Sequence, residues 1–409
     1  MSSFNFYISV PIADGAYSDF IDITSDVLEN SVGNLKQKLA SNEYDIGTIK
    51  FNKITVNLDN RKAKYSEANN PLSFFQSKRD ESIIKITWDR NKQAISCGGL
   101  TCGFSYLSHP VEVYKGLLED NTSKFDADSQ VQTFNFLGTE SIIGKTQVPY
   151  DDLNVLDDAE TTIYNILNQA SITKFLVVDQ ANITLSNNFI PDDITSLKNK
   201  KSLDALNEIL FLGGGVLYVK SDVIYIKTRV ESVENVFTFY GPSSDKGIEN
   251  LHDLSSYTLG LNRTFNFWTW QGTDLVQKFD DSIERNGFLP KEVGSELITD
   301  DLKRLTILST LLTEFGFPKI ELDITVPMTT PIVKEIFLLD KINIDYPADY
   351  RANDDQNTLP SRYGLAKYGQ DTYIHATSSL IIDISKNWKI LNRTLSVKTQ
   401  KIKYKIREI

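Results

Sequence analysis

The chain has 409 residues, of which 41% are hydrophobic and 24% are charged, and its formal net charge at pH 7 is −11. This is the composition of an ordinary globular protein, so it argues against intrinsic disorder and against a membrane-spanning helix of about 20 apolar residues. The negative charge argues against wrapping nucleic acid by phosphate neutralisation.

A chain of this length exceeds what one hydrophobic core usually serves, so we expect two to three domains of roughly 100–200 residues each. Residues 1–10 lack the basic and apolar stretches of a secretory signal. Only two cysteines occur, which predicts folding in a reducing compartment. Cys97 and Cys102 flank a glycine-containing turn and are expected to be buried thiols, with a bridge across a hairpin as the alternative; no second cysteine pair completes a metal site.

Residues 1–150 predict a first β-rich domain. Apolar and polar residues alternate over much of 49–58 and 84–88, and again near 111–114 and 131–136. Turn signals such as Asp59-Asn60 separate these segments. Several short strands at this spacing favour an antiparallel barrel or sandwich.

Residues 151–235 predict a small α/β module. An amphipathic helix follows Asp157 and Asp158, whose carboxylates suit the positive end of a helix. A second helix is expected over 202–211, with Ser202 as its N-cap and the glycines 213–215 as its end. A hairpin is expected to follow, with strands at 216–219 and 223–226.

Residues 236–280 and 318–409 predict a second β-rich domain, interrupted by a helical insertion at 281–317. The inserted helix is expected over 300–315, with Thr299 as its cap and Gly316 and Pro318 at its end. Its apolar side is expected to consist of Leu302, Leu305, Leu308, Leu311 and Leu312. Residues 348–370 contain few apolar residues and predict a long loop.

The C-terminal segment is basic although the whole chain is acidic. Residues 386–409 hold eight lysines and arginines against Glu408 alone, a net charge of +7, so the other 385 residues carry −18. This asymmetry suits contact with an acidic neighbour, such as another copy of the chain. The alternative is a solvated edge strand that its lysines protect from aggregation.

The sequence predicts no catalytic, cofactor-binding or metal-binding residues. His109, His252 and His375 are scattered, and the phosphate-loop, dinucleotide and nucleophile-elbow motifs are absent. Three carboxylate pairs could in principle cleave a glycosidic bond, but helix caps and solvated loops explain them better. These pairs are Asp151-Asp152, Asp157-Asp158 and Asp354-Asp355.

Two further features bear on binding. Asn353-Asp354-Asp355 lacks the spacing of a calcium loop. Trp268 and Trp270 stand two residues apart and point to one face of a strand, where they pack in a core or a subunit contact or, alternatively, stack on a sugar.

With these elements in order, the chain resembles the baseplate or tail hub proteins of tailed bacteriophages, including the T-even phage hub and the N-terminal hub region of siphophage tail-associated proteins. The resemblance covers nearly the whole chain and rests on loose hydrophobic patterns with punctuation. The segments that carry it are 49–60, 113–118, 271–273, 295–298 and 339–347. One departure is Leu339, where the family often has glycine before Asp340.

The resemblance implies an α+β, mainly β fold with two tail-tube-like antiparallel β-barrel domains, the α/β module between them and the helical insertion in the second. It further implies a homotrimeric ring in the virion tail that joins a sixfold tail tube to threefold tip proteins and is not an enzyme. The implied partners are the tail tube or distal tail protein, the tape-measure protein, and tip, spike or fibre proteins. DNA would pass through transiently, without sequence-specific binding and without a cofactor.

Two other functions remain open at this point. A distal-tail or tail-tube relative would form hexamers. A carbohydrate-binding or wall-degrading tail protein would use exposed aromatic residues with a carboxylate pair.

Overall fold

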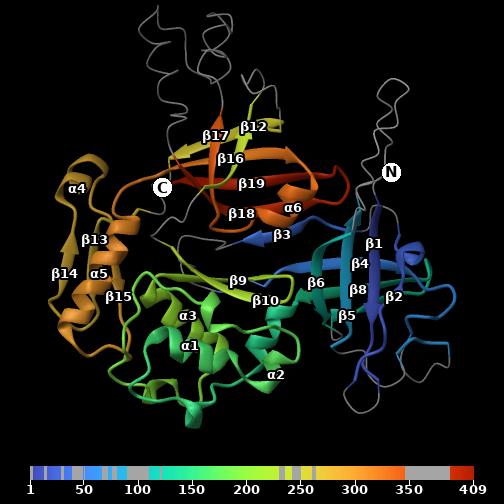
Figure 1. Ribbon diagram of the computed structural model, residues 1–409, viewed down its shortest axis with the longest axis horizontal. Coiled ribbons are helices and arrows are strands. Elements are labelled where there is room, and N and C mark those ends of the chain that lie inside the picture. The colour runs from blue at the N-terminus through green and yellow to red at the C-terminus, as the bar shows by residue number, and fades with distance from the viewer. Residues whose placement is uncertain are drawn as a thin grey trace, which may run out of the picture.

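The computed structural model describes residues 3–12, 16–28, 32–38, 49, 51–66, 72–75, 81–89, 110–119, 122–229, 235–241, 250–259, 264–345 and 387–409. The fold is α+β and mainly β, as expected, and has two large sheets, a helical module and a smaller insertion (Figure 1). None of the helices in these ranges combines the length and apolarity needed to cross a membrane. Several positions considered above lie outside the described residues: Cys97, Cys102, His109, His375, Asp354-Asp355 and the segment 348–370.

The first large sheet comes from the N-terminal part of the chain. Its strand order is β2-β1-β5-β6-β8-β4, with β7 on β8, and every pairing is antiparallel. The strands are β1 (Ser3–Ser9), β2 (Ile21–Asp22), β4 (Lys53–Asp59), β5 (Ile83–Asp89), β6 (Val111–Leu118), β7 (Lys124–Asp126) and β8 (Val131–Gly138). The sheet curls until its edges meet, because Val27, just after β2, bridges to Leu58 of β4.

Alternation of side chains explains why these segments became strands. In β4, Ile54, Val56 and Leu58 are buried, and the residues between them are partly exposed. In β8, Phe134 and Phe136 are fully buried on the same pattern. Side chains that alternate in this way place one face of the sheet in the core, so the strands expected near 49–58, 84–88, 111–114 and 131–136 are confirmed.

The second large sheet comes from the C-terminal part. Its strand order is β11-β17-β18-β19-β16-β12. The strands are β11 (Asn235–Tyr240), β12 (Asp253–Leu259), β16 (Ile320–Pro327), β17 (Lys341–Asp345), β18 (Trp388–Ser396) and β19 (Lys401–Glu408). The two outermost strands approach each other at one end, where the Leu251 N–H donates to the Tyr240 carbonyl over 3.0 Å.

Both sheets follow one cyclic strand order. Taken around the ring, the first sheet reads β1-β5-β6-β8-β4-β2 and the second reads β11-β17-β18-β19-β16-β12. The first, second, third, fourth, fifth and sixth strands of each sheet thus hold equivalent places when β3 and β7 are set aside. The two sheets differ in the direction of their first strand, because β1 is antiparallel to β5 whereas β11 is parallel to β17.

One N-terminal strand joins the other sheet. β3 (Leu35–Lys38) falls within the expected first domain, yet it pairs with β18 through the register Leu35↔Leu395 to Lys38↔Asn392. β17 covers only the first part of β18, so the rest of that strand's edge is open for β3. Sequence pattern carries no information about such a partner, because a strand reads the same in either sheet.

The α/β module forms largely as expected. It holds α1 (Ala159–Leu167), α2 (Ala170–Thr173), α3 (Ser202–Gly213) and the hairpin of β9 (Gly215–Lys220) and β10 (Val223–Thr228). Gly214 ends α3 in the left-handed conformation, with φ of 67°, as the glycine run predicted. The expected N-cap at Ser202 is wrong, because Lys201 takes the cap position and Ser202 is the first helical residue.

The insertion is larger than the sequence indicated. It contains a three-stranded sheet in the order β14-β13-β15, made of β13 (Phe267–Trp270), β14 (Val276–Lys278) and β15 (Pro290–Val293), together with α4 (Asp280–Asn286) and α5 (Asp301–Phe315). The tryptophan strand β13 was expected in the second large sheet, but it pairs only with β14 and β15 among the described residues. A short helix, α6 (Thr330–Glu335), follows β16.

Two details of α5 differ from expectation. Asp300 caps the helix by accepting a hydrogen bond from the Lys303 N–H, in place of Thr299. Leu302 was expected on the apolar side but is 75% exposed. Leu302 lies in the first turn of α5, and the buried residues of this helix begin only at Ile307. The spacing of the leucines alone therefore predicts the wrong environment for Leu302.

Two buried clusters hold these parts together. One cluster joins both large sheets and includes Leu35, Phe134 and Tyr404. The other joins the module to the insertion and includes Ile163 and Trp268. The two large sheets therefore share one core, and the module and the insertion share another. We call the module and the insertion together the helical body.

The placement of β3 gives a direct test. Leu35 is 3% exposed, so Leu35→Ala removes buried apolar volume and should destabilise the fold by about 2–4 kcal/mol, lowering the unfolding temperature. The matched control Leu72→Ala, at a site 66% exposed, should leave that temperature nearly unchanged. Equal behaviour of the two variants in a thermal melt would show that β3 is not docked.

Candidate functional site

Two of the three carboxylate pairs noted in the sequence lie within the described residues, where one pair is exposed to solvent and the other is at the start of a helix. Asp151 and Asp152 are exposed in a short 3₁₀ helix. Asp158 is the N-cap of α1, accepting from the Thr161 N–H over 2.8 Å, and Asp157 accepts from Asn165 over 3.1 Å. Across the described ranges no three histidine, cysteine, aspartate or glutamate side chains gather as metal ligands do.

The tryptophan pair is in the core. Trp268 and Trp270 are 0% and 2% exposed, and Trp268 lies against Phe265 and Phe315. The indole N–H of Trp268 donates to the Phe265 carbonyl. Core packing is therefore confirmed, and the sugar-stacking alternative is wrong for these two residues.

A small cavity lies where β3, the module and the α6 segment meet. Its volume is about 20 Å³, enough for about one water molecule. Glu140 lines it, and burial raises the pKa of this carboxyl, although the Asn52 N–H donates to it over 3.0 Å. A cavity of this size cannot hold an organic substrate.

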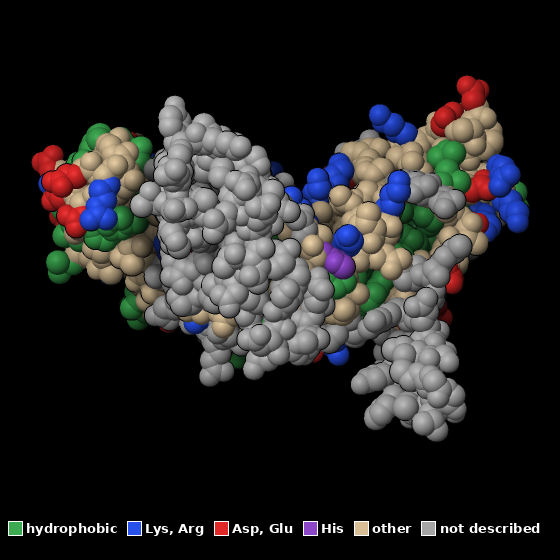
Figure 2. Space-filling view, turned by 90° about the horizontal axis from the view of Figure 1, so that it is seen from above, with side chains coloured by type: hydrophobic (Ala, Val, Ile, Leu, Met, Phe, Trp, Pro, Cys, Tyr) green, Lys and Arg blue, Asp and Glu red, His purple; other side chains and the backbone are tan. Residues whose placement is uncertain are grey.

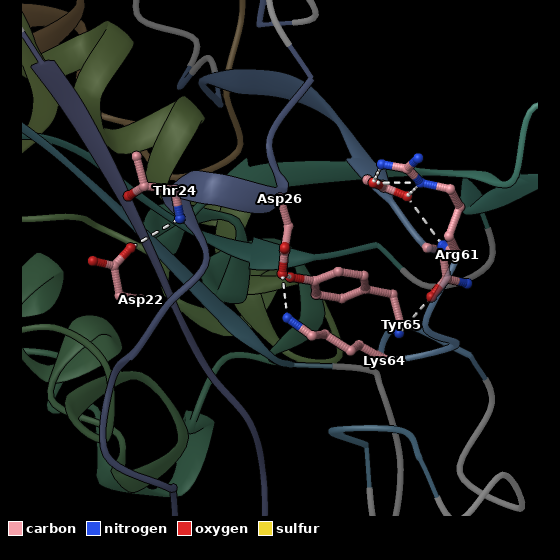
Figure 3. Close-up of polar contacts among 8 residues, drawn as sticks. Asp22, Thr24, Asp26, Arg61, Lys64 and Tyr65 are labelled. Carbon is pink, nitrogen blue, oxygen red and sulfur yellow. Dashed lines mark hydrogen bonds and ion pairs between the residues drawn. The ribbon is translucent and has the colours of Figure 1, made fainter.

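A polar cluster instead closes the first sheet (Figure 3). Asp26 Oδ2 accepts from Tyr65 Oη over 2.7 Å and from Lys64 Nζ over 2.9 Å. Thr24 Oγ1 accepts from the Phe6 N–H of β1 over 2.9 Å, and Asp22 Oδ1 accepts from the Thr24 N–H over 2.9 Å. We call Asp26, Lys64 and Tyr65 the closing triad.

The closing triad fixes the place where the two edges of the sheet meet. Asp26 directly precedes Val27, which bridges to Leu58, while Lys64 and Tyr65 lie in the turn that follows β4. Tyr65 is fully buried and packs edge-on against Phe134. Burial, and then the neighbouring Asp26, raise the pKa of Tyr65 well above its usual value, so the phenol stays a hydrogen-bond donor.

A nearby ion pair contributes less. Asp59 accepts from Arg61 Nε over 2.8 and 2.9 Å at the surface. The hydrogen bonds from Arg61 hold the pKa of Asp59 near 2. Exposed pairs of this kind contribute little to stability, so the closing triad and not this pair secures the sheet.

A second cluster ties the module, the insertion and the second sheet together. The Arg229 guanidinium, just after β10, is 3.2 Å from Glu314 of α5 and lies over the Phe211 and Phe315 rings. Lys389 Nζ of β18 donates to the Arg229 carbonyl. Removal from water lowers the pKa of Lys389 to about 8, which Glu314 opposes and the nearby cations reinforce.

The motif at 339–347 performs a related joining role. Asp340, which is 6% exposed, accepts from Lys227 Nζ of β10 over 2.7 Å and from the Phe337 N–H over 2.7 Å. Leu339 has φ of 64°, the left-handed conformation that favours glycine. The turn therefore keeps a glycine-like backbone although the residue is leucine.

The basic C-terminal segment is partly neutralised within the chain. Lys403 is 2.9 Å from Asp323 and Lys405 is 2.6 Å from Glu321, both across the β16–β19 pairing. β19 lies between β18 and β16, so the alternative of a lysine-protected edge strand is wrong. Lys398 and Lys401, at the β18–β19 turn, remain exposed.

The visible surface carries mixed charge. Seen from above, acidic and basic side chains stand close together at both ends of the described surface (Figure 2).

The residues of the closing triad and the Arg229 cluster were not predicted. They lie outside every motif, and only the fold brings them together.

Comparisons with known proteins agree on the fold alone. No protein-family model and no curated protein matches the chain. Over 99% of its length it is similar to the tail protein from Neisseria meningitidis MC58, with a TM-score of 0.54, 11% identity and 96% of that chain covered. It is similar over 99% of its length to the prophage MuSo2 43 kDa tail protein from Shewanella oneidensis, with a TM-score of 0.52, 10% identity and 97% of that chain covered. The chain thus has the fold of these tail proteins, which confirms the resemblance at the level of fold.

The closing triad predicts a specific loss of stability. Asp26→Ala removes the acceptor of the buried Tyr65 hydroxyl and should cost about 1–3 kcal/mol, seen as a lower unfolding temperature. Arg61→Ala removes only the exposed ion pair and should unfold at the same temperature as the wild type. The role assigned to the triad fails if both variants melt alike.

The Arg229 cluster predicts a pH dependence. Below pH 8 Lys389 is charged in both states, but between 8 and its ordinary 10.5 the unfolded chain retains a proton that the folded chain has released. Stability of the wild type should therefore rise with pH in that window relative to Lys389→Met, by at most about 1.4 kcal/mol per pH unit.

Thermal melts of wild type and Lys389→Met from pH 7 to 10 measure this difference. The control Lys398→Met changes an exposed lysine of the β18–β19 turn and should show no such slope against wild type. A difference between wild type and Lys389→Met that is constant with pH would contradict the assignment.

Proposed function

We propose that this chain is a structural hub of a phage tail or baseplate, acting in the virion tail without catalysis. The observation that carries the proposal is the common cyclic strand order of the two large sheets. The similarity in fold to two phage tail proteins supports it.

In the proposed assembly the two sheets are tail-tube-like β-barrels, and three chains form a homotrimeric ring. Three chains with two equivalent barrels each present six similar units around one axis. Such a ring can face a sixfold tail tube on one side and threefold tip proteins on the other. Ring closure also satisfies complementary subunit surfaces that would otherwise add copies without limit.

The domain limits proposed from sequence fit this assembly with two changes. The first barrel falls within 1–150 but gives β3 to the second sheet. The second barrel falls within 236–280 and 318–409, with β13 and β14 assigned to the helical insertion. The α/β module at 151–235 then lies beside both barrels.

The proposed partners follow from the position of a hub. The tail tube or a distal tail protein binds one face, and tip, spike or fibre proteins bind the other. The tape-measure protein and then DNA pass through the opening, without sequence-specific contacts. A channel wall of negative potential would keep the phosphates from adhering, and an atomic structure of the ring with mostly basic wall residues would contradict this part.

The two alternatives are weaker. A distal-tail or tail-tube relative would assemble as a hexamer from single barrels, whereas this chain already holds two equivalent sheets. The two tryptophans that could have stacked on a sugar, Trp268 and Trp270, are buried, which removes the observation that favoured a carbohydrate-binding or wall-degrading protein. The described carboxylate pairs cap helices or lie in solvent.

Light scattering on the purified full chain tests the proposal. The expected mass is about three times the monomer mass of 46.3 kDa. A sixfold mass would support the distal-tail alternative, and a monomer at all concentrations would contradict the hub. A cell-wall zymogram should show no clearing, and clearing would support the enzymatic alternative.

A further inference from the structure

Four large aliphatic side chains stand exposed where the α/β module meets the start of α5 in the insertion. Leu156 is 80% exposed, Leu302 75%, Val155 53% and Ile190 47%. Isolated exposed aliphatic residues are normal on a protein surface, but a group of them marks an interaction site. The question is whether these four belong to one surface.

Hydrogen bonds join the three segments that carry them. Asn188 donates to Asp158 over 2.9 Å, and the Ala159 N–H donates to the Phe189 carbonyl over 2.7 Å, which places 155–159 beside 188–190. Lys303 Nζ donates to the Ile190 carbonyl over 2.9 Å, which places the start of α5 beside the same segment. The four side chains therefore stand on adjoining segments.

Carboxylates surround these side chains. We define the apolar–acidic patch as Val155, Leu156, Ile190 and Leu302 together with Asp157, Asp158, Asp192, Asp300 and Asp301. Lys303 pairs with Asp192 and Arg304 pairs with Asp301, so five aspartates against two cations leave a net charge of −3. Partial burial opposes ionisation of Asp192, but hydrogen bonds from Lys303 and from the N–H groups of Asp300 and Thr299 outweigh it and hold the pKa near 2.

The chain carries a surface of opposite character elsewhere. At the β18–β19 turn, Lys398 and Lys401 are exposed beside the partly exposed Val397, and within the described ranges neither lysine has a carboxylate at ion-pair distance. Figure 1 places β18 and β19 above the module, with β3, β9 and β10 between them and the module's helices. The two surfaces therefore lie on different parts of the chain.

We propose that the apolar–acidic patch docks the β18–β19 turn of a second copy of this chain. Lysines of the turn face the aspartates, and the exposed part of Val397, whose remainder packs against the core of its own chain, meets the aliphatic residues. Because the two surfaces differ, the contact is head-to-tail, the type that closes into a ring when the rotation between copies permits. The inference rests on the proposed trimeric hub and names the contact that forms it.

Two variants break the contact from its two sides. Leu156→Arg with Leu302→Arg alters the patch, and Lys398→Ser with Lys401→Ser alters the turn. Each should reduce the mass measured by light scattering threefold, from trimer to monomer, with an unchanged unfolding temperature of the monomer fold by circular dichroism. Matched controls are Leu72→Arg with Phe125→Arg, at sites 66% and 52% exposed, and Lys62→Ser with Lys124→Ser; both should stay trimeric.

Mixing the two broken variants gives the sharpest outcome. Each retains one intact surface, so an equimolar mixture should form a one-to-one dimer that cannot grow or close. Two-fold isologous contacts would give no such recovery. Trimers in both variants alone would overturn the proposed contact while leaving the hub intact, whereas a monomeric wild type would overturn the hub itself.

Discussion

An open sheet edge exposes unpaired backbone donors and acceptors, and the architecture of this protein depends on removing such edges. In the first sheet the closing triad holds the short 3₁₀ helix Thr24–Asp26 against the turn after β4. Val27, the next residue, can then bridge to Leu58. A buried tyrosine hydroxyl that needs its carboxylate acceptor makes this closure specific, because any other arrangement leaves a buried polar group unpaired. Along β18, β3 covers the part of the edge that β17 leaves open.

Closure explains why one strand order occurs twice. Six strands in the order first, fourth, fifth, sixth, third and second return to their starting edge in both sheets, and only the direction of β11 breaks the equivalence. Lys227, Asp340, Arg229 and Glu314 then tie the module and insertion to the second sheet. The helical body thus fixes how the two sheets stand relative to one another, which a ring of equivalent units requires.

The sequence predicted what depends on neighbours along the chain. Alternation in β4 and β8, the α1 stripe after Asp158 and the glycine end of α3 all act within a few residues, and all were predicted correctly. What failed depends on distant partners: β3 pairs some 350 residues away, and the tryptophan strand β13 forms a sheet of its own. The closing triad was beyond prediction because Asp26 and Tyr65 meet only after the sheet curls. Leu339 shows the converse, since its backbone is left-handed although leucine rarely adopts that conformation and so gave no sign of it.

The central claim is that the two sheets act as equivalent units of one ring. Electron microscopy of the assembled particle, with rotational averaging of end-on views, measures this most directly. The account predicts threefold symmetry overall, with a strong sixfold component confined to the inner ring where the two sheets alternate. A threefold ring without any sixfold component, or a particle with no central ring, would contradict it.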